Sequence, residues 1–358
     1  MKHRYTALTG IVLGAALLLS AIGCTGAPAG SGNAPSAQET QPAAPEPDTR
    51  QLTDTTAYKA RLSNSFEGIE PATAAELTFT ADADGVTITG YTGGATVLVI
   101  PAELDGKPVV AVGEGAFRGA AVRALSLPDS LRRVGEYAFA NCQTLLSLCL
   151  SAGTESLGAH MLEGCARLEK LALPFVGGAA DAPETAYLGY LFGAASHTLT
   201  EGFLPASLQS VELLPGCTAV PDNAFYECSR LREIILPDTV TSVGYRAFYR
   251  CAYLTAVTLP AGLTALSDEA FSGCVRLETA DLSMLDTTDG WGIQTFRGCI
   301  SLRSVTLSDS LSGRLPSGTF AGCTALEELR GAAALEPDAS AFRGCPVYER
   351  TAGTGTGA

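Results

Sequence analysis

The sequence predicts a β-rich solenoid, in which the chain winds into stacked coils, preceded by a disordered tether. Two observations carry this prediction. A phrase that contains Ala-Phe and ends in Cys recurs every 22 to 25 residues, apart from one longer gap. Between its copies, short segments alternate apolar and polar residues in the manner of half-buried strands.

The composition bounds the class of protein. With 46% hydrophobic and 17% charged residues, the 358-residue chain can bury a large core and is not generally disordered. Only 7% of the residues are aromatic whereas 39 are Gly, which favours repetition over one packed globule. Acidic residues outnumber basic residues 37 to 23, so we expect no nucleic acid among the partners.

Residues 1–23 have the pattern of an export signal peptide. Lys2 and Arg4 supply positive charge, residues 11–19 are apolar, and small residues precede Cys24. This ending resembles a bacterial lipobox, which implies that Cys24 is lipidated and anchors the protein to a membrane. The alternatives are an ordinary secretory signal or an uncleaved anchor, and both also place the body of the protein outside the cytoplasm.

Two segments lead from the signal to the folded part. Residues 24–50 begin with the lipidated Cys and are rich in Pro and Ala, without Leu, Ile, Val, Met or aromatic residues, so we expect a disordered tether. Residues 51–76 carry apolar residues at near-helical spacing and are interpreted as a short helix or an irregular lead-in.

Residues 77–120 are expected to form an N-terminal cap and the first repeat. Leu77 to Thr80 and Val86 to Thr89 alternate in polarity around Asp84-Gly85, which favours a β-hairpin. The Asp residues of this turn are explained by the hairpin better than by a calcium loop, because apolar residues follow where further oxygen ligands would be needed. We expect no metal site.

Residues 121–350 contain the regular repeats. Phe225, Phe248 and Phe271 are 23 residues apart, a period within the range of leucine-rich repeats. Burial explains the repetition, because ordering one coil of 23 residues costs on the order of 35 kcal/mol. A coil with both faces in water would unfold, whereas stacked coils bury their Leu, Val and Phe side chains between neighbours, at about 1.5 to 3 kcal/mol each.

Residues 77 to about 348 resemble the BspA-like leucine-rich repeats of bacterial surface proteins. The phrase that runs from Leu-Pro through Val-Gly to Ala-Phe-x-x-Cys, seen in Leu236 to Cys251, is highly specific to that family. The resemblance implies a right-handed solenoid with two short strands and a helical turn per coil. It also implies an extracellular adhesion or recognition surface without catalytic machinery.

Three segments depart from the repeat. The insertion at residues 174–207 carries Tyr187 and Tyr190, and is interpreted either as a hairpin packed on the solenoid edge or as a ligand-facing loop. A smaller excursion carries Trp291, which is either a binding anchor or a half-buried loop residue. The tail at residues 351–358 is rich in Gly and Thr and is expected to be frayed.

The cysteines admit two interpretations. An exported protein favours disulfides. However, the eight repeat cysteines occupy equivalent places in successive coils and have no unique partner, so a ladder of buried thiols is the preferred interpretation. Cys149 lies outside the repeat phrase, between two leucines that face the core. We therefore expect it on the outward strand face, either as a reactive thiol or as an incidental substitution.

The outward strand face is one candidate binding surface. In the pattern L-x-x-V-x-L, the residue between the two last apolar residues faces outward. The candidate ligand-binding residues of this row are Glu212, Ile235, Thr258, Asp281 and Thr306, and its other members are Ser126, Cys149 and Ala172. Alternatively, this face is merely solvated and the contacts lie in the insertion, through Tyr187 and Tyr190, or at Trp291.

Catalytic patterns are absent from the sequence. After the signal only His160 and His197 remain, and no zinc-protease, nucleophile-elbow or phosphate-loop motif occurs, so we expect neither an enzyme nor a cofactor. A Cys nucleophile, Cys149 or Cys217, paired with one of these histidines is a remote alternative.

The leading hypothesis is a monomeric, membrane-anchored lipoprotein of the bacterial cell surface. Its solenoid would bind an extracellular protein, a matrix ligand or a glycan. A structural or scaffolding component of the cell envelope is the alternative.

Overall fold

The computed structural model describes residues 69–286, 288–331 and 340–346. The predicted signal, Cys24, the tether and the tail lie outside the described residues, as does the lead-in up to residue 68. Its described part, residues 69–76, is irregular and ends in a turn, which agrees with the irregular lead-in, one of the two interpretations of this segment.

An antiparallel hairpin caps the N-terminal end of the stack. Strand β1 (Leu77–Ala81) pairs with β2 (Val86–Tyr91), as predicted. The turn is closed by Asp82, whose Oδ1 accepts hydrogen bonds from the N–H groups of Asp84 and Gly85 at 2.9 and 3.1 Å. Strand β2 then pairs in parallel with β5 (Lys107–Val112), which also carries the short antiparallel β4 (Glu103–Leu104).

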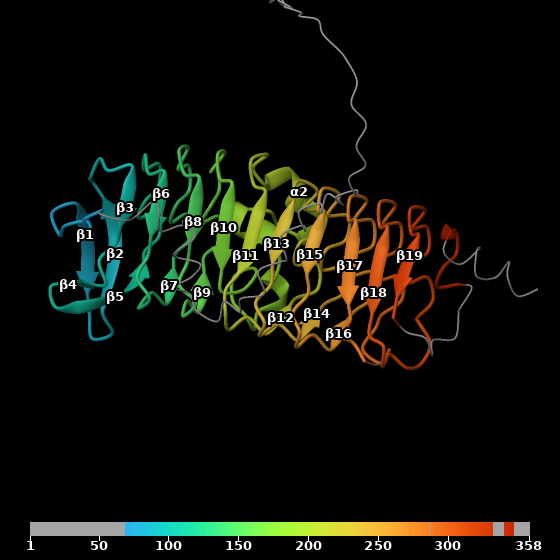
Figure 1. Ribbon diagram of the computed structural model, residues 1–358. Coiled ribbons are helices and arrows are strands. Elements are labelled where there is room, and N and C mark those ends of the chain that lie inside the picture. Colours follow the sequence, from blue (N-terminus) through green and yellow to red (C-terminus); the bar gives the residue numbers. More distant parts are fainter. Residues whose placement is uncertain (1–68, 287, 332–339, 347–358) are drawn as a thin grey trace, which may run out of the picture. The chain divides into compact units, whose positions relative to one another are not determined.

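Parallel strands from successive coils form the long face of the solenoid (Figure 1). The first sheet runs in the order β15-β13-β11-β10-β8-β6-β3, and β17, β18 and β19 form a second one. Because each coil adds one strand beside the last, the predicted solenoid is confirmed. The strands are β3 (Val97–Val99), β6 (Ala124–Ser126), β8 (Ser147–Cys149), β10 (Lys170–Leu173), β11 (Ser210–Leu213), β13 (Glu233–Ile235), β15 (Ala256–Thr258), β17 (Thr279–Leu282), β18 (Ser304–Leu307) and β19 (Glu328–Arg330).

A second, shorter strand follows the corner of most coils. In the N-terminal half these strands continue the sheet of the cap, in the order β1-β2-β5-β7-β9, and beyond the insertion they form the sheet β12-β14-β16. The insertion therefore separates the two sheets on this side. The strands are β7 (Arg133–Val134), β9 (Ser156–Leu157), β12 (Ala219–Val220), β14 (Ser242–Val243) and β16 (Ala265–Leu266).

The Ala-Phe phrase forms a hydrogen-bonded turn on the third side of each coil, not a regular helix. In one coil the N–H groups of Asn223, Phe225 and Glu227 donate to carbonyl oxygens of the next coil at 2.7–2.8 Å. Asn223 and Glu227 have left-handed backbones, with φ of 57° and 52°. These residues turn every second N–H toward the neighbouring coil, so the phrase binds coils together instead of closing a helix.

The phenylalanine rings stack from coil to coil in the core. The ring centroids of Phe225 and Phe248 are 5.3 Å apart, and those of Phe248 and Phe271 are 4.8 Å apart. The stack continues through Phe296 and Phe320, and all these rings are fully buried. The predicted alignment of the Phe side chains is therefore confirmed.

The repeat cysteines form the predicted ladder of buried thiols. All ten cysteines from 142 to 345 are thiols and all are buried. The thiol of Cys251 donates to the carbonyl oxygen of Phe225 at 3.2 Å, and that of Cys274 donates to Phe248 at 3.1 Å. Since a small S–H donor reaches a buried carbonyl of the preceding coil, Cys both packs there and satisfies a polar group.

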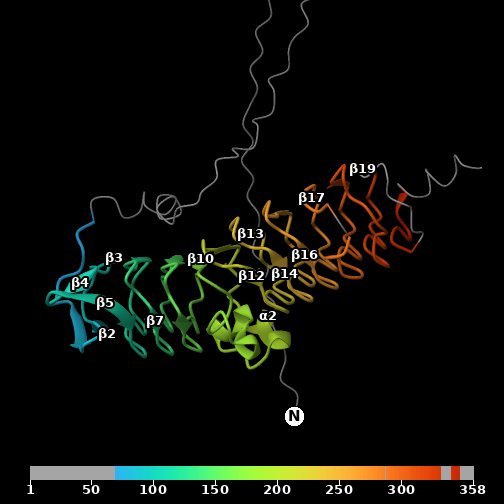
Figure 2. The same ribbon diagram turned by 90° about the horizontal axis from the view of Figure 1, so that it is seen from below.

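The insertion is helical, so the hairpin, the first of its two interpretations, is wrong, while the ligand-facing loop stays a prediction. It contains the 3-10 helices η1 (Pro183–Thr185), η2 (Leu188–Phe192) and η3 (His197–Leu199) and the short helix α2 (Thr200–Phe203). Figure 2 shows these elements gathered on one side of the stacked coils.

Hydrogen bonds tie the insertion into the stack as an irregular coil. The N–H of Leu162, in the preceding coil, donates to the carbonyl of Leu191 at 2.8 Å. The N–H of Leu188 donates to the carbonyl of Ala224, in the following coil, at 2.9 Å. Leu188, Leu191 and Phe192 are buried in the core. The helical turns of the insertion therefore occupy one level of the stack. They supply its buried apolar side chains and its hydrogen bonds to the neighbouring coils without a strand.

Candidate binding surfaces

The strand-face row lies in the predicted register over three strands. Glu212 is paired with Ile235 across β11 and β13, and Ile235 with Thr258 across β13 and β15. Asp281 is likewise paired with Thr306 across β17 and β18. No strand ladder joins β15 to β17 among the described residues, so the row has two parts.

The row presents small and mildly acidic side chains. Thr258 and Asp281 are exposed, whereas Glu212, Ile235 and Thr306 are partly buried. Asp281 Oδ1 accepts a hydrogen bond from the N–H of Ser283 at 3.0 Å, which fixes its carboxylate beside the strand end. The structure thus provides a regular and lightly polar surface at these positions.

Cys149 does not lie exposed on this face, which corrects the prediction. It is only 7% exposed and packs with Ala172 and Leu214 in a small apolar cluster, against which Ala152 also lies. Strand alternation fixes the direction of a side chain but not what covers it. Here Leu214 and Ala152, which do not belong to the row, pack beside Cys149 and Ala172 and shield the thiol.

The two tyrosines of the insertion differ in exposure. Tyr187 is 9% exposed, and its hydroxyl donates to the carbonyl of Ala194 at 2.9 Å. Tyr190 is partly buried and meets Tyr187 edge to face, with ring centroids 6.3 Å apart. Burial raises the pKa of both phenols. Tyr187 therefore acts mainly as a packing residue, while part of Tyr190 reaches the surface.

Trp291 is buried, with 7% of its surface exposed, and forms an isolated parallel bridge with Leu266 of β16. It is therefore neither an exposed anchor nor a half-buried loop residue. Its indole Nε1 has no hydrogen-bond partner among the described residues.

Sequence reasoning missed an aromatic and cationic row beside the insertion. His197, Tyr226 and Tyr249 pack in series, with ring centroids 5.2 and 5.1 Å apart. Arg246 lies 5.0 Å from the ring of Tyr249 and forms a two-bond ion pair with Glu269 at 3.0 and 3.2 Å. The signal was present, because the variant Ala-Phe-Tyr-x-Cys occurs in two successive coils.

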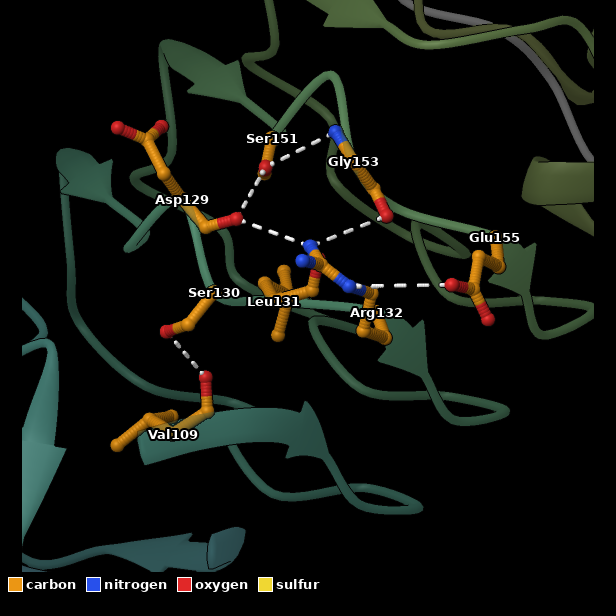
Figure 3. Close-up of polar contacts among 8 residues, drawn as sticks. All are labelled: Val109, Asp129, Ser130, Leu131, Arg132, Ser151, Gly153 and Glu155. Carbon is orange, nitrogen blue, oxygen red and sulfur yellow. Dashed lines mark hydrogen bonds and ion pairs between the residues drawn. The ribbon is translucent and has the colours of Figure 1, made fainter. Parts of the chain in front are cut away.

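A cavity of about 380 Å³ lies where the insertion separates the two sheets of shorter strands, β1-β2-β5-β7-β9 and β12-β14-β16. Phe175 and Asp181 of the insertion line it, together with Glu155 and Cys217 from flanking coils. Figure 3 shows the network beside it, in which Arg132 donates to the carbonyl of Gly153 at 3.3 Å and lies 3.8 Å from the Glu155 carboxylate. Glu155 thus already has a cationic neighbour.

The thiol and imidazole groups of the remote enzymatic alternative have other contacts. Cys217 donates to the carbonyl of Ala219 at 3.3 Å, and burial raises its thiol pKa, which disfavours the nucleophilic thiolate. His160 Nδ1 lies 2.8 Å from a carboxylate oxygen of Glu163, and His197 packs on Tyr226.

Within residues 69–286, 288–331 and 340–346, no group of three or more His, Cys, Asp or Glu side chains is placed to hold a metal ion. In the same residues, no helix has the length and hydropathy needed to cross a membrane.

The chain is similar to several known proteins. Among solved structures, the chain is similar to a leucine-rich-repeat protein of T. pallidum, with 22% identity over 80% of this chain and 95% of that chain and a TM-score of 0.31. A leucine-rich cell surface protein from Faecalibacterium prausnitzii shares 21% identity, with 78% and 87% coverage and a TM-score of 0.35. A comparison with curated proteins gave no match.

The model of the BspA type leucine-rich repeat region matches six copies, over residues 107–177 and 218–348. These ranges cover more than half of the chain and include the coils on both sides of the insertion. The chain therefore belongs to the family of BspA type leucine-rich-repeat proteins.

Proposed function

We propose that this chain is a non-catalytic lipoprotein of the bacterial cell surface, whose solenoid recognises an extracellular protein or matrix ligand. The observation that carries the proposal is the outer strand face, where Glu212, Ile235 and Thr258 stand side by side on paired strands. Parallel strands lie about 4.8 Å apart, so such a row offers a long and rigid contact surface. A surface of this kind suits a protein partner better than a small molecule, which favours a deep apolar pocket.

A matched pair of variants tests the proposed face. Thr258→Arg places a long cation in the middle of the row, whereas Ala261→Arg adds the same charge at an exposed corner residue outside the strand. Immobilised full chain is titrated with purified matrix proteins and with the bacterium's own envelope proteins. We expect saturable binding of an external protein that Thr258→Arg weakens by about tenfold and Ala261→Arg leaves unchanged.

Other results contradict the proposal. Equal loss in both variants, or no loss in either, argues against the strand face. Binding confined to envelope proteins of the bacterium supports the scaffolding role instead.

The membrane anchor is a separate part of the proposal. Residues 1–23 direct export, and acylation of Cys24 holds the monomeric chain at the membrane through residues 24–50. Cys24→Ala should release the protein from the membrane fraction and abolish labelling by a radioactive fatty acid. Unchanged lipid labelling in this variant contradicts lipidation at Cys24.

A further inference from the structure

A second cavity, of about 270 Å³, lies at the corner where strands β11 and β13 begin. It is lined by Gln209, just before β11, by Arg230 and Arg232, just before β13, and by Tyr253 of the next coil. Helix α2 of the insertion reaches this corner, because Ser229, which also lines the cavity, donates a hydrogen bond to the Glu201 carboxylate (Figure 1). The cavity is distinct from the row of the outer strand face.

The guanidinium groups at this corner differ from the paired arginines of the molecule. Arg132, Arg246 and Arg250 each lie within 4.0 Å of a Glu carboxylate. Arg230 and Arg232 are exposed and form no such ion pair with any residue that the structure describes. In a chain of net charge −14, two guanidinium groups that line one cavity and have no ion pair with a described carboxylate favour the binding of an anion there.

An aromatic ring stands beside these cations. Tyr253 is 43% exposed, which is unusual for a large side chain in this stack. The guanidinium of Arg276 lies 4.2 Å from its ring centroid, a cation–π contact that holds the ring and adds a third positive charge. Arg276, too, has no ion pair within the described residues.

The other polar side chains that line the cavity are neutral, while the Glu201 carboxylate lies at its edge, bound to Ser229. Gln209 contributes an amide with both donors and an acceptor. The Ser229 hydroxyl already donates to Glu201, so its oxygen is available as an acceptor. Cations, an aromatic ring and neutral hydrogen-bonding groups thus line one small space, whose volume lies below the roughly 300 to 1,000 Å³ of sites that enclose a whole small molecule.

We propose that this cavity binds one acidic sugar residue of a saccharide chain. Arg230 and Arg232 hold the sugar carboxylate, and Tyr253 packs against the apolar C–H face of the ring. Gln209 donates hydrogen bonds to the sugar hydroxyls or accepts hydrogen bonds from them, whereas Ser229 only accepts. The volume fits a single residue, so the rest of the saccharide extends into solvent. The site adds a saccharide ligand to the protein ligand proposed for the strand face and does not depend on it.

The test is calorimetric titration of the full chain with a hyaluronan hexasaccharide, which carries one carboxylate on every second sugar. Arg230→Gln and Arg232→Gln remove charge with little change of shape, and Tyr253→Ala removes the ring. The matched control is Arg303→Gln, because Arg303 follows its repeat leucine as Arg232 does but lies three coils further along, outside the cavity. Chitohexaose, a neutral hexasaccharide, and a hexaglutamate peptide serve as control ligands.

We expect saturable binding of the hyaluronan hexasaccharide, weakened about tenfold or more by each cavity variant and unchanged by Arg303→Gln. Equal loss with Arg303→Gln indicates general charge attraction and overturns the site. Equal binding of chitohexaose overturns the role of the carboxylate, and equal binding of hexaglutamate overturns the assignment to a sugar. Absence of hyaluronan binding overturns the proposal, whatever the strand face binds.

Discussion

The regular coils from Phe225 to Phe296 and the insertion at 174–207 fill the same stack by different means. In the regular coils a phenylalanine ring, a thiol and alternate N–H groups repeat with each turn. In the insertion, helical turns supply Leu188, Leu191 and Phe192 to the core. Within the described residues, three backbone hydrogen bonds join it to the preceding coil and one joins it to the following coil. Every level of the stack therefore buries apolar side chains and pairs its backbone with the neighbouring coils. The repeat phrase achieves this in the regular coils, and helical turns achieve it in the insertion.

The edge of the insertion shows what the phrase contributes. From Cys251 onward, each repeat thiol donates to the carbonyl of the phenylalanine in the preceding coil, for instance Cys251 to Phe225 at 3.2 Å. Cys228 is the first repeat cysteine after the insertion, and it has no such partner among the described residues; its thiol donates to the carbonyl of Tyr226 in its own turn, at 3.9 Å. The thiol ladder is thus a property of adjacent regular coils.

The largest expected effect comes from alkaline pH acting on the buried thiols, which belong to the regular coils because residues 174–207 contain no cysteine. Burial raises the pKa of Cys142 from 9.0 to about 11 and that of Cys165 to about 12. A thiol whose pKa is raised in the folded state stabilises fully below pH 9, and this stability is lost as pH rises through the folded value. Urea midpoints should be level from pH 7 to 8.5 and fall steeply between pH 9 and 11.

The control is the double variant Cys142→Ala/Cys165→Ala, whose midpoint should fall less over the same pH range. An identical fall would assign the pH dependence to groups other than these two thiols.

Truncation of one ring in the regular stack is the next largest effect. Phe248 is fully buried between Phe225 and Phe271, so Phe248→Ala should lower the free energy of unfolding by about 3 to 5 kcal/mol. Chemical denaturation measures the loss. A midpoint equal to that of the parent protein would mean that Phe248 is not interior.

The same substitution in the two regions should have opposite signs. At Gly244 a Cβ atom would lie 2.6 Å from the backbone nitrogen of Asp222 in the preceding coil, so Gly244→Ala should destabilise by about 1 to 3 kcal/mol. At Gly202, in α2 of the insertion, a Cβ would meet nothing within 4 Å, so Gly202→Ala should stabilise by about 0.4 to 1 kcal/mol. Thermal or urea unfolding of both variants checks the signs, and a destabilised Gly202→Ala would contradict the open helix surface.

Repetition explains which parts of the fold were predictable. The common environment of Phe225, Phe248 and Phe271 was predictable because the same requirement, burial between stacked coils, recurs every 23 residues. The insertion occurs once, so no second copy separated its apolar spacing from that of a strand, and the hairpin was predicted wrongly. Trp291 likewise lies in an excursion that occurs once, so no repeated pattern indicated how deeply its side chain is buried.

For the candidate surfaces, the sequence predicts the side to which each side chain points but not which residues of other coils cover it. Alternation placed Glu212, Ile235 and Thr258 in one row, which the strand register confirms. It placed Cys149 in the same row but could not show that Leu214, 65 residues later, packs with it. The basic corner at Arg230 and Arg232 is assembled from three coils, so its lack of carboxylate partners is visible only when the coils are stacked.

The most direct test of the account is hydrogen exchange at the two joints of the insertion. The N–H groups of Leu162 and Leu188 each bond to a neighbouring level of the stack, as that of Phe225 does in a regular coil. If the stack continues through the insertion, exchange resolved to single residues should show both amides protected to within about tenfold of the Phe225 amide. Exchange of Leu162 and Leu188 at the rate of an open loop, with Phe225 still protected, would show that the insertion interrupts the solenoid.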